Sequence, residues 1–460
     1  MVISRKPYKE NLMRVIVAAL GIGISATILY YYSSYLVSHP PSWDVRQYFE
    51  YGKEIEAKGL FGYSHPFRTY MFPLYISLIP FNLEDGFGGF ISSFAYIQSS
   101  LFIVSSCVIL FLIRDSRYFF HFLFGVCINP LVLIYIPVPL TESLVCLVIM
   151  VLFAFVANSD RIKPVFFVIA AGTMGGTLVV IRPASIFIGA GLIVFCLLYI
   201  WRQYKYRKES THAYKPVLSF ILIVCLGISF IIPISVQYYL NYKQHKKVSF
   251  IASDLGSFQL KEGIELYKYG TLFLSRKGWF TGMRYESGIA PPADEKYLLF
   301  YFKNPLKGAK LALTHIYSAL NYDFLEPYIY SKFKRISFYQ ILSSLITILG
   351  FFGLVSYWAG NFKRNEMPVN LYTLADILIL FQIPMLAVVA VETRFGLIVT
   401  MFLSVRAVAL LFEVNKMKFR MMIFILIFTV TYVVCSVQFS EHLYSKVKLR
   451  TPPVTYLWDE

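Results

Sequence analysis

Five ionisable residues stand where this chain enters or leaves long apolar runs. Asp44 follows the first apolar run, within the segment SHPPSWDVRQYFE. The other four stand in the stretches PVPLTESLVCLVIM, VVIRPASIF and AVVAVETRFGLIV and are Glu142, Arg182, Glu392 and Arg394. A carboxylate in such a place can accept a proton from a reacting group, and a guanidinium can bind an anion with its planar fork. These residue types therefore allow acid–base chemistry beside a bound anion.

Each of these charges also has an ordinary structural explanation. Asp44 can cap the helix that follows it, and Glu142 can be an acid favoured in the first turn of a helix. Arg182 and Arg394 can reach towards lipid headgroups, and Glu392 can simply pair with Arg394. The choice between a shared site and separate explanations depends on the elements that carry the five residues.

The composition identifies the class of protein. Of the 460 residues, 57% are hydrophobic and 15% are charged, and the mean hydropathy is +0.60. This is too little polar surface to cover a soluble globule of this length, so the chain is predicted to be an all-α polytopic membrane protein. The net charge of +17 is attributed to cytoplasmic loops, where Lys and Arg accumulate. No nucleic-acid partner is predicted.

About eleven membrane spans are predicted from apolar stretches of roughly 20 residues, the length that crosses a hydrocarbon core of ~30 Å. The predicted spans are 15–37, 89–113, 118–136, 141–157, 165–181, 184–201, 216–240, 337–359, 371–391, 395–412 and 419–438. The predicted domains are a membrane module with a first outer loop at 38–88, a large outer loop, a C-terminal group of helices and an outer tail. Their ranges are 1–240, 241–336, 337–438 and 439–460.

The distribution of basic residues predicts which loops lie outside. Connections rich in Lys and Arg alternate with connections that nearly lack them, which places the basic set and the N-terminus in the cytoplasm. The segments 38–88 and 241–336 then lie outside. By this topology all five ionisable residues stand on the outer side, and an ionisable group in a span normally faces a cavity or a partner. We therefore favour a shared site.

The outer segments carry helical patterns of their own. The apolar positions Tyr48, Tyr51, Ile55 and Leu60 recur at helical spacing among charged residues, which predicts an amphipathic helix along the membrane surface. The run MFPLYISLIPF is too short to cross a membrane. The stretch KYLLFYFKNPLKGAKLALTHIYSAL predicts a pair of interfacial helices broken at Asn304-Pro305. No cofactor and no metal site is predicted, because the six cysteines lie in apolar runs without CxxC spacing.

Several of these features together resemble the glycosyltransferases of the GT-C fold. The features are the acid after the first span, the interfacial helices, and the motifs NPLVLIYIPVPLTES, GGTLVVIRP, FKNPLKGAKLAL and ETRF in this order. The resemblance covers positions 44 to about 400 and is greatest to protein mannosyltransferases and the aminoarabinose transferases of lipid A. It implies a GT-C-like bundle in a cell membrane, and the absence of glycosylation sequons favours a bacterial plasma membrane.

The resemblance also implies an activity. Such enzymes move a sugar from a polyprenyl-phosphate carrier to an acceptor hydroxyl on the outer side, with inversion at the anomeric carbon. The acceptor can be a glycan, a lipid or a protein. In this reading Asp44 is the general base that takes the proton of the acceptor hydroxyl. His65 and Arg68 are further candidates for contacts with the acceptor or the phosphate, although both can also be ordinary surface residues.

The remaining candidates receive roles around the phosphate of the donor. Arg182 and Arg394 are expected to stabilise the departing lipid phosphate, since the guanidinium fork matches phosphate oxygens. Glu142 and Glu392 are expected to orient these arginines or to hold sugar hydroxyls. Two other functions stay open. A transporter or flippase of lipid-linked saccharides predicts functional charges at mid-membrane, and a polymerase or ligase of lipid-linked glycans predicts essential arginines and a histidine such as His245 in the large loop.

Overall fold

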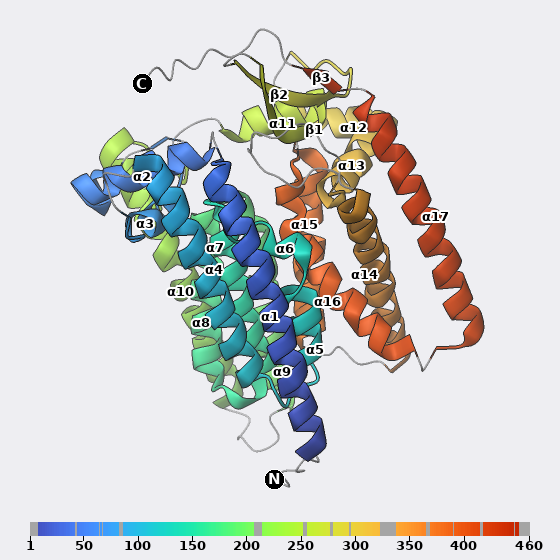
Figure 1. Ribbon diagram of the computed structural model, residues 1–460. Helices are drawn as coiled ribbons and strands as arrows, with labels where there is room; N and C mark the ends of the chain where they lie inside the picture. Colours follow the sequence, from blue (N-terminus) through green and yellow to red (C-terminus); the bar gives the residue numbers. More distant parts are fainter. Residues whose placement is uncertain are drawn as a thin grey trace.

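The computed structural model describes residues 8–41, 44–63, 65–66, 68–81, 86–206, 214–251, 255–276, 279–293, 296–322, 337–364, 369–389, 391–414, 417–445 and 447–449. Residues 450–460 of the predicted outer tail lie outside these ranges. The described residues form a bundle of long helices with a layer of short elements across one end (Figure 1). We call this end, which carries α2, α3 and the sheet, the upper end, and the end near the N-terminus the lower end.

Nine helices of the described residues are long and apolar enough to cross a membrane. Each has at least 18 residues, and a helix rises 1.5 Å per residue, so each can span most or all of a hydrocarbon core of ~30 Å. The chain is therefore a helical multi-pass membrane protein, as its composition predicted. The nine helices are α1 (Tyr8–Ser38), α4 (Gly86–Leu112), α8 (Pro164–Ile181), α9 (Ile186–Tyr206), α10 (Tyr214–His245), α14 (Ser337–Arg364), α15 (Leu371–Val388), α16 (Leu397–Glu413) and α17 (Phe419–Tyr444).

The predicted count of about eleven spans is too high for the helices that the structure describes. The predicted span 118–136 is broken into α5 (Phe119–Phe122), a π-helical turn η3 (Leu123–Cys127) and α6 (Pro130–Leu133). The break has a local cause, because Pro130 cannot continue a helix and Asn129 instead accepts a hydrogen bond from the backbone N–H of Leu131 to start α6. The predicted span 141–157 is α7 (Thr141–Ala157), a shorter helix of 17 residues.

The helices differ in how much of their surface is covered by protein. In α16 and α15, 78% and 67% of the apolar window is buried inside the bundle, whereas the corresponding shares are 22% in α1 and 11% in α17. Large apolar side chains such as Val15, Leu20, Phe424 and Leu426 are exposed on the peripheral helices. Since a membrane protein solvates such side chains with lipid, α15 and α16 form the centre of the bundle and α1 and α17 face the bilayer.

Close helix contacts explain why glycines stand inside spans. A Cβ at Gly172 of α8 would lie 2.1 Å from Ser229 Oγ, and one at Gly176 would lie 2.3 Å from the Phe230 carbonyl oxygen, both on α10. The four-residue spacing puts both glycines on one face, which lets the two backbones approach. This packing holds the upper end of α8 in place, and Arg182 follows directly after that helix.

The segment 38–88, which the sequence analysis assigned to the outside, contains the predicted amphipathic helix and a second, short helix. α2 (Asp44–Lys58) buries Val45, Tyr48, Phe49 and Ile55 at helical spacing. A turn η1 (Leu60–Gly62) follows, and then α3 (Met71–Ser77), whose seven residues cannot cross a membrane. α2 and α3 lie together at the upper end of the bundle (Figure 1).

The segment 241–336, which the sequence analysis also assigned to the outside, combines helices with a small sheet in its described part. α11 (Leu255–Glu265) is followed by β1 (Leu266–Arg276) and β2 (Trp279–Glu286), and then by α12 (Tyr297–Lys303) and α13 (Pro305–Leu320), which are separated at Asn304 as predicted. The strands β1, β2 and β3 (Val447–Leu449) form one antiparallel sheet. The helical bundle agrees with the all-α prediction, and this small sheet is an addition that the sequence analysis did not include. The segments LYKYGTLFLSR and WFTGMRYE are rich in aromatic residues, which favour strands once a partner strand is present.

Candidate functional site

Asp44 stands at the start of α2, a helix that is fixed by aromatic packing. The ring of Tyr48 meets Phe72 of α3 edge to face at a centroid distance of 4.8 Å, and Phe49 lies 4.9 Å from Phe90 of α4. These contacts bury one face of α2 against the bundle. The first residue of the helix is thereby held over the upper ends of the spans.

Both carboxylate oxygens of Asp44 are bound by arginines from distant segments. Arg68, in the connection between α2 and α3, places Nη2 2.7 Å from Oδ1, and Arg394 places Nη2 3.0 Å from Oδ2. The guanidinium of Arg68 also lies over the ring of Tyr48, 5.1 Å from the centroid. Asp44 therefore joins the N-terminal module to the segment between α15 and α16, across 350 residues of sequence.

Glu142 and Arg182 form the second ion pair of the site. Glu142 lies in the first turn of α7, and Arg182 is the residue after α8, where Pro183 favours the extended backbone with φ −144° and ψ 114°. This conformation precedes the short turn η5 (Pro183–Ser185). Arg182 Nη1 lies 2.9 Å from Glu142 Oε1, and the Glu142 side chain is only 2% exposed. Thr141 donates a hydrogen bond to the other Glu142 oxygen at 3.1 Å.

Arg394 connects the two pairs. It lies in η6 (Thr393–Gly396), directly before α16. Its Nε donates to Glu392 Oε2 and lies 3.9 Å from Glu142 Oε1, while its Nη2 reaches Asp44. The ring of Phe395 lies beneath two guanidinium groups, 4.5 Å from that of Arg182 and 5.5 Å from that of Arg394. One aromatic ring therefore holds both arginines by cation–π contact.

The ion pairs combine into one neutral network. Its six side chains carry three negative and three positive charges, and their exposed fractions range from 2% to 28%. Burial raises the pKa of the Glu392 carboxyl, and Arg394 opposes that shift. We call this set the upper-end network, and it consists of Asp44, Arg68, Glu142, Arg182, Glu392 and Arg394.

His65 lies in the connection between η1 and α3, and it contacts Tyr51 of α2 beside the upper-end network. Its Nε2 is 2.8 Å from the hydroxyl of Tyr51, and the two rings are in contact at a tilt of 41°, with their centroids 4.4 Å apart. Burial lowers the pKa of His65 to about 4, with further contributions from Arg68 and then His245. His65 is therefore neutral at pH 7 and contacts Tyr51, whereas Arg68, three residues later, bonds Asp44.

The sequence brought seven residues forward, and the structure gathers six of them in the upper-end network. It did not single out Phe395 or the contact of Tyr48 with Arg68. Tyr48 stands one helical turn after Asp44, and this spacing alone could have indicated that the two side chains are neighbours. Phe395 only follows Arg394 in sequence, and nothing in the pattern shows that its ring reaches Arg182 as well.

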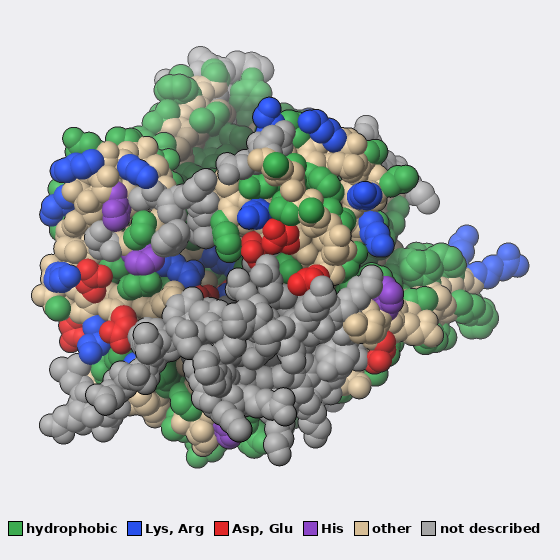
Figure 2. All heavy atoms as spheres, turned by 90° about the horizontal axis from the view of Figure 1, so that it is seen from above, with side chains coloured by type: hydrophobic (Ala, Val, Ile, Leu, Met, Phe, Trp, Pro, Cys, Tyr) green, Lys and Arg blue, Asp and Glu red, His purple; other side chains and the backbone are tan. Residues whose placement is uncertain are grey.

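The site offers guanidinium groups and carboxylates but no built metal centre. Among the described ranges, no group of three or more His, Cys, Asp or Glu side chains could hold a metal ion. The arrangement can bind an anion by exchanging a carboxylate for it at an arginine, and a carboxylate released in this way can accept a proton. Seen from above, the upper end carries acidic and basic side chains interspersed among hydrophobic ones (Figure 2).

No known family model matches the chain, and no curated protein matches it.

Proposed function

We propose that this chain is a membrane glycosyltransferase of the GT-C type that uses a sugar carried on polyprenyl phosphate. It transfers the sugar to a hydroxyl group of a glycan, lipid or protein at the upper end, which faces the outside of a bacterial plasma membrane. The observation that carries the proposal is the contact of Asp44 with two guanidinium groups, at 2.7 and 3.0 Å. The ion pair of Arg182 with Glu142 lies beside them. The sequence motifs described above support the assignment to the GT-C type.

In the proposed reaction, the residues of the upper-end network take the proton of the acceptor and stabilise the departing phosphate. The acceptor oxygen attacks the anomeric carbon from the face opposite the phosphate, so a new C–O bond forms as the bond to the phosphate oxygen breaks. Asp44 takes the proton of the acceptor hydroxyl, and its side chain is the most exposed of the three acids, at 16% against 12% and 2%. The lipid phosphate leaves with its negative charge stabilised by Arg182 and Arg394.

The network couples donor binding to the base. A carboxylate held by two guanidinium groups is a poor proton acceptor, because both positive charges favour its ionised form. A donor phosphate competes with Asp44 for Arg394, and bidentate pairing of guanidinium with phosphate is favourable. When Arg394 turns to the phosphate, one Asp44 oxygen becomes available to the acceptor hydroxyl. The base is then active only when donor is present, which suppresses loss of the sugar to water.

The Asp44→Asn variant tests the proposal. Asn keeps the size and caps a helix about as well as Asp, but it cannot take the proton. We expect transfer from a polyprenyl-phosphate sugar to fall by about 10²-fold or more, with donor still bound. Turnover with purified full-length protein, donor affinity and thermal stability are measured side by side.

Glu56→Gln is the matched control, since Glu56 is an exposed acid on the same helix. It should leave transfer unchanged. An Asp44→Asn protein with near wild-type turnover would exclude Asp44 as the base. If Asp44→Asn does not fold, Asp44→Glu tests the position of the base instead: it keeps a carboxylate but moves it by one methylene, so transfer should fall while the charge of the network is kept, and unchanged turnover would contradict a positioned base at Asp44. Absence of transfer by the wild type with all polyprenyl-phosphate sugars offered would contradict the proposed function itself.

A further inference from the structure

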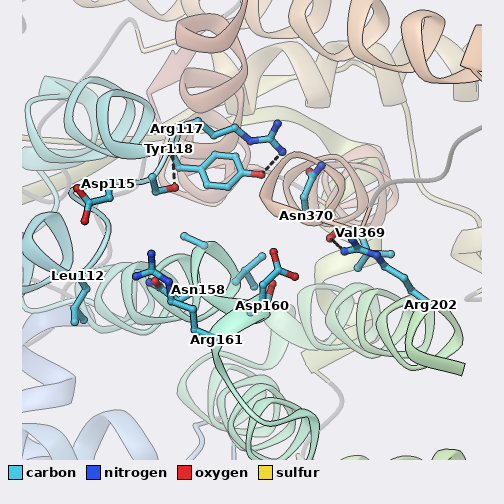
Figure 3. Close-up of a pocket in the computed structure, with 14 residues that line it drawn as sticks. Leu112, Asp115, Arg117, Tyr118, Asn158, Asp160, Arg161, Arg202, Val369 and Asn370 are labelled. Atoms are coloured by element: carbon cyan, nitrogen blue, oxygen red, sulfur yellow. Dashed lines mark hydrogen bonds between the residues drawn. The ribbon is translucent and has the colours of Figure 1, made fainter. Parts of the chain in front are cut away.

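A polar cavity of about 440 Å³ opens at the lower end of the bundle, opposite the upper-end network. It lies between the end of α4, the turn before α5, the end of α7 with η4 (Ser159–Arg161), Arg202 of α9 and the residues that precede α15. Four parts of the sequence, 112–118, 156–161, 202 and 369–370, thus meet around it (Figure 3). Its volume falls in the range of sites for small molecules, ~300–1,000 Å³.

Three arginines line this lower-end cavity, and their guanidinium groups are not neutralised as those of the upper-end network are. Arg117 donates to the phenolic oxygen of Tyr118 at 2.8 Å, and Arg202 donates to the Val369 carbonyl at 3.1 Å (Figure 3). Both partners are neutral. Within the described ranges none of the cavity arginines, Arg161 included, makes an ion pair. An anion can therefore bind here without displacing a carboxylate.

Two other groups of the lining show which anion fits. Tyr118 is 6% exposed, and because its oxygen accepts from Arg117, its own hydrogen can be donated to a ligand oxygen. Asp160 also lines the cavity, and it repels a bare anion but accepts hydrogen bonds from hydroxyl groups. The other lining carboxylate, Asp115, pairs at 3.6 Å with Arg114, a residue that does not line the cavity. The lining thus combines phosphate-binding groups with one acceptor for hydroxyls.

We propose that the lower-end cavity is a second binding site, for a phosphate ester that carries free hydroxyl groups, such as a glycerol phosphate. Arg117, Arg161 and Arg202 bind the phosphate, and Asp160 accepts a hydroxyl of the alcohol. The cavity lies at the ends of membrane-spanning helices, so the ester can be the headgroup of a lipid such as phosphatidylglycerol or a soluble molecule. The site is independent of the proposed transfer reaction, since it shares no residue with the upper-end network.

Binding to the purified full chain tests the site with two probes. One is glycerol 3-phosphate added to protein in neutral detergent, and the other is phosphatidylglycerol in nanodiscs of phosphatidylcholine. We expect Arg161→Gln and Arg202→Gln each to weaken binding about tenfold or more, because each removes a charge-assisted hydrogen bond to phosphate. Binding of glycerol 3-phosphate assigns the site to a soluble ester, and binding only of the lipid assigns it to a headgroup.

Lys163→Gln is the matched control, since Lys163 is an exposed cation two residues from Arg161 that does not line the cavity. It should leave both affinities unchanged. Equal losses in Lys163→Gln and Arg161→Gln would show that only the surface charge attracts the probe, and they would overturn the proposal. So would failure of the wild type to bind either probe. Arg161 makes no hydrogen bond through its side chain in the described structure, so its variant tests binding even if Arg202→Gln fails to fold.

Asp160→Ala, which removes both the charge and the hydrogen-bond acceptor, distinguishes a phosphate ester from a bare anion. Removal of the negative charge should strengthen binding of inorganic phosphate, whereas loss of the hydroxyl acceptor should weaken binding of glycerol 3-phosphate. The two probes are therefore expected to change in opposite directions. A variant that binds both more tightly would contradict the role of Asp160 and the hydroxyl-bearing ligand with it.

Discussion

Two groups of paired arginines and acids in the described part of the bundle are built differently. In the upper-end network, Arg394 contacts the carboxylates of Asp44 and Glu392, and the acids stand at helix ends. Deeper in the bundle, Arg406 of α16 lies 3.1 Å from Asp376 of α15, and their side chains are 1% and 0% exposed. We call this the buried pair. Guanidinium and carboxylate groups thus pair in a partly exposed environment at the upper end and in a fully buried one in the buried pair.

The difference lies in what else each guanidinium contacts. Arg406 Nη2 donates to the Gly353 carbonyl at 2.8 Å, and the guanidinium lies against the rings of Tyr357 and Tyr372 at 4.5 and 4.9 Å. These partners belong to packed helices. A Cβ at Gly353 would meet the Arg406 carbonyl oxygen at 2.3 Å, so the backbones are in close contact there. The buried pair joins α14, α15 and α16, whereas the partly exposed upper-end network can exchange partners.

The largest effect should come from breaking the buried pair. Asp376→Ala leaves the Arg406 charge uncompensated in the centre of the bundle, and we expect a loss of about 3–5 kcal/mol in the free energy of unfolding. The double variant Asp376→Ala/Arg406→Met should recover most of it, because it removes both charges and keeps an apolar chain. Unfolding in mixed micelles measures both. If the single variant is as stable as the wild type, the buried pair is not structural.

The comparison also shows how far the sequence could predict the molecule. Charges at the ends of apolar runs identified Asp44 and Arg394 as members of a site, because the alternation of basic loops put them on one side. The pairing of Asp44 with Arg394 could not be read, since it depends on how helices far apart in sequence pack. Asp376 and Arg406 were overlooked although each stands inside a predicted span, where an ionisable residue is itself a signal.

The fold was predictable to a similar extent. Long apolar stretches predicted the helices, and Pro305 predicted the break between α12 and α13. Pro130 breaks the predicted span 118–136 for the same physical reason, but its apolar surroundings concealed the break. The sheet could not be predicted, because β3, at Val447–Leu449, pairs with β2 from a distant part of the chain. Local patterns do not encode such pairing.

Replacing arginine by lysine should affect the upper-end network through activity rather than stability. Arg394→Lys keeps the charge but cannot bind Asp44 and Glu392 with one planar fork. We expect about 10- to 10²-fold slower transfer, and a smaller loss for Arg182→Lys, which contacts one acid. Arg406→Lys is the matched control in the buried pair and should lower stability instead. Equal loss of stability in Arg394→Lys and Arg406→Lys would remove the distinction between the two environments.

The smallest effect concerns pH, and it should appear near the upper-end network through His65. Burial, Arg68 and His245 lower the pKa of His65 from 6.5 to about 4. Between these values the unfolded chain binds a proton that the folded chain does not, so stability rises with pH and is lost as pH falls from about 6.5 towards 4. Because His65 is only partly buried, solvent screening limits the loss to about 1 kcal/mol.

His65→Gln cannot titrate, and it should lose less stability than the wild type when unfolding is measured at pH 7 and again at pH 5. The same pH dependence of stability in both proteins would mean that His65 takes up a proton as readily in the folded as in the unfolded chain. Its position beside Arg68 and its contact with Tyr51 would then not hinder protonation.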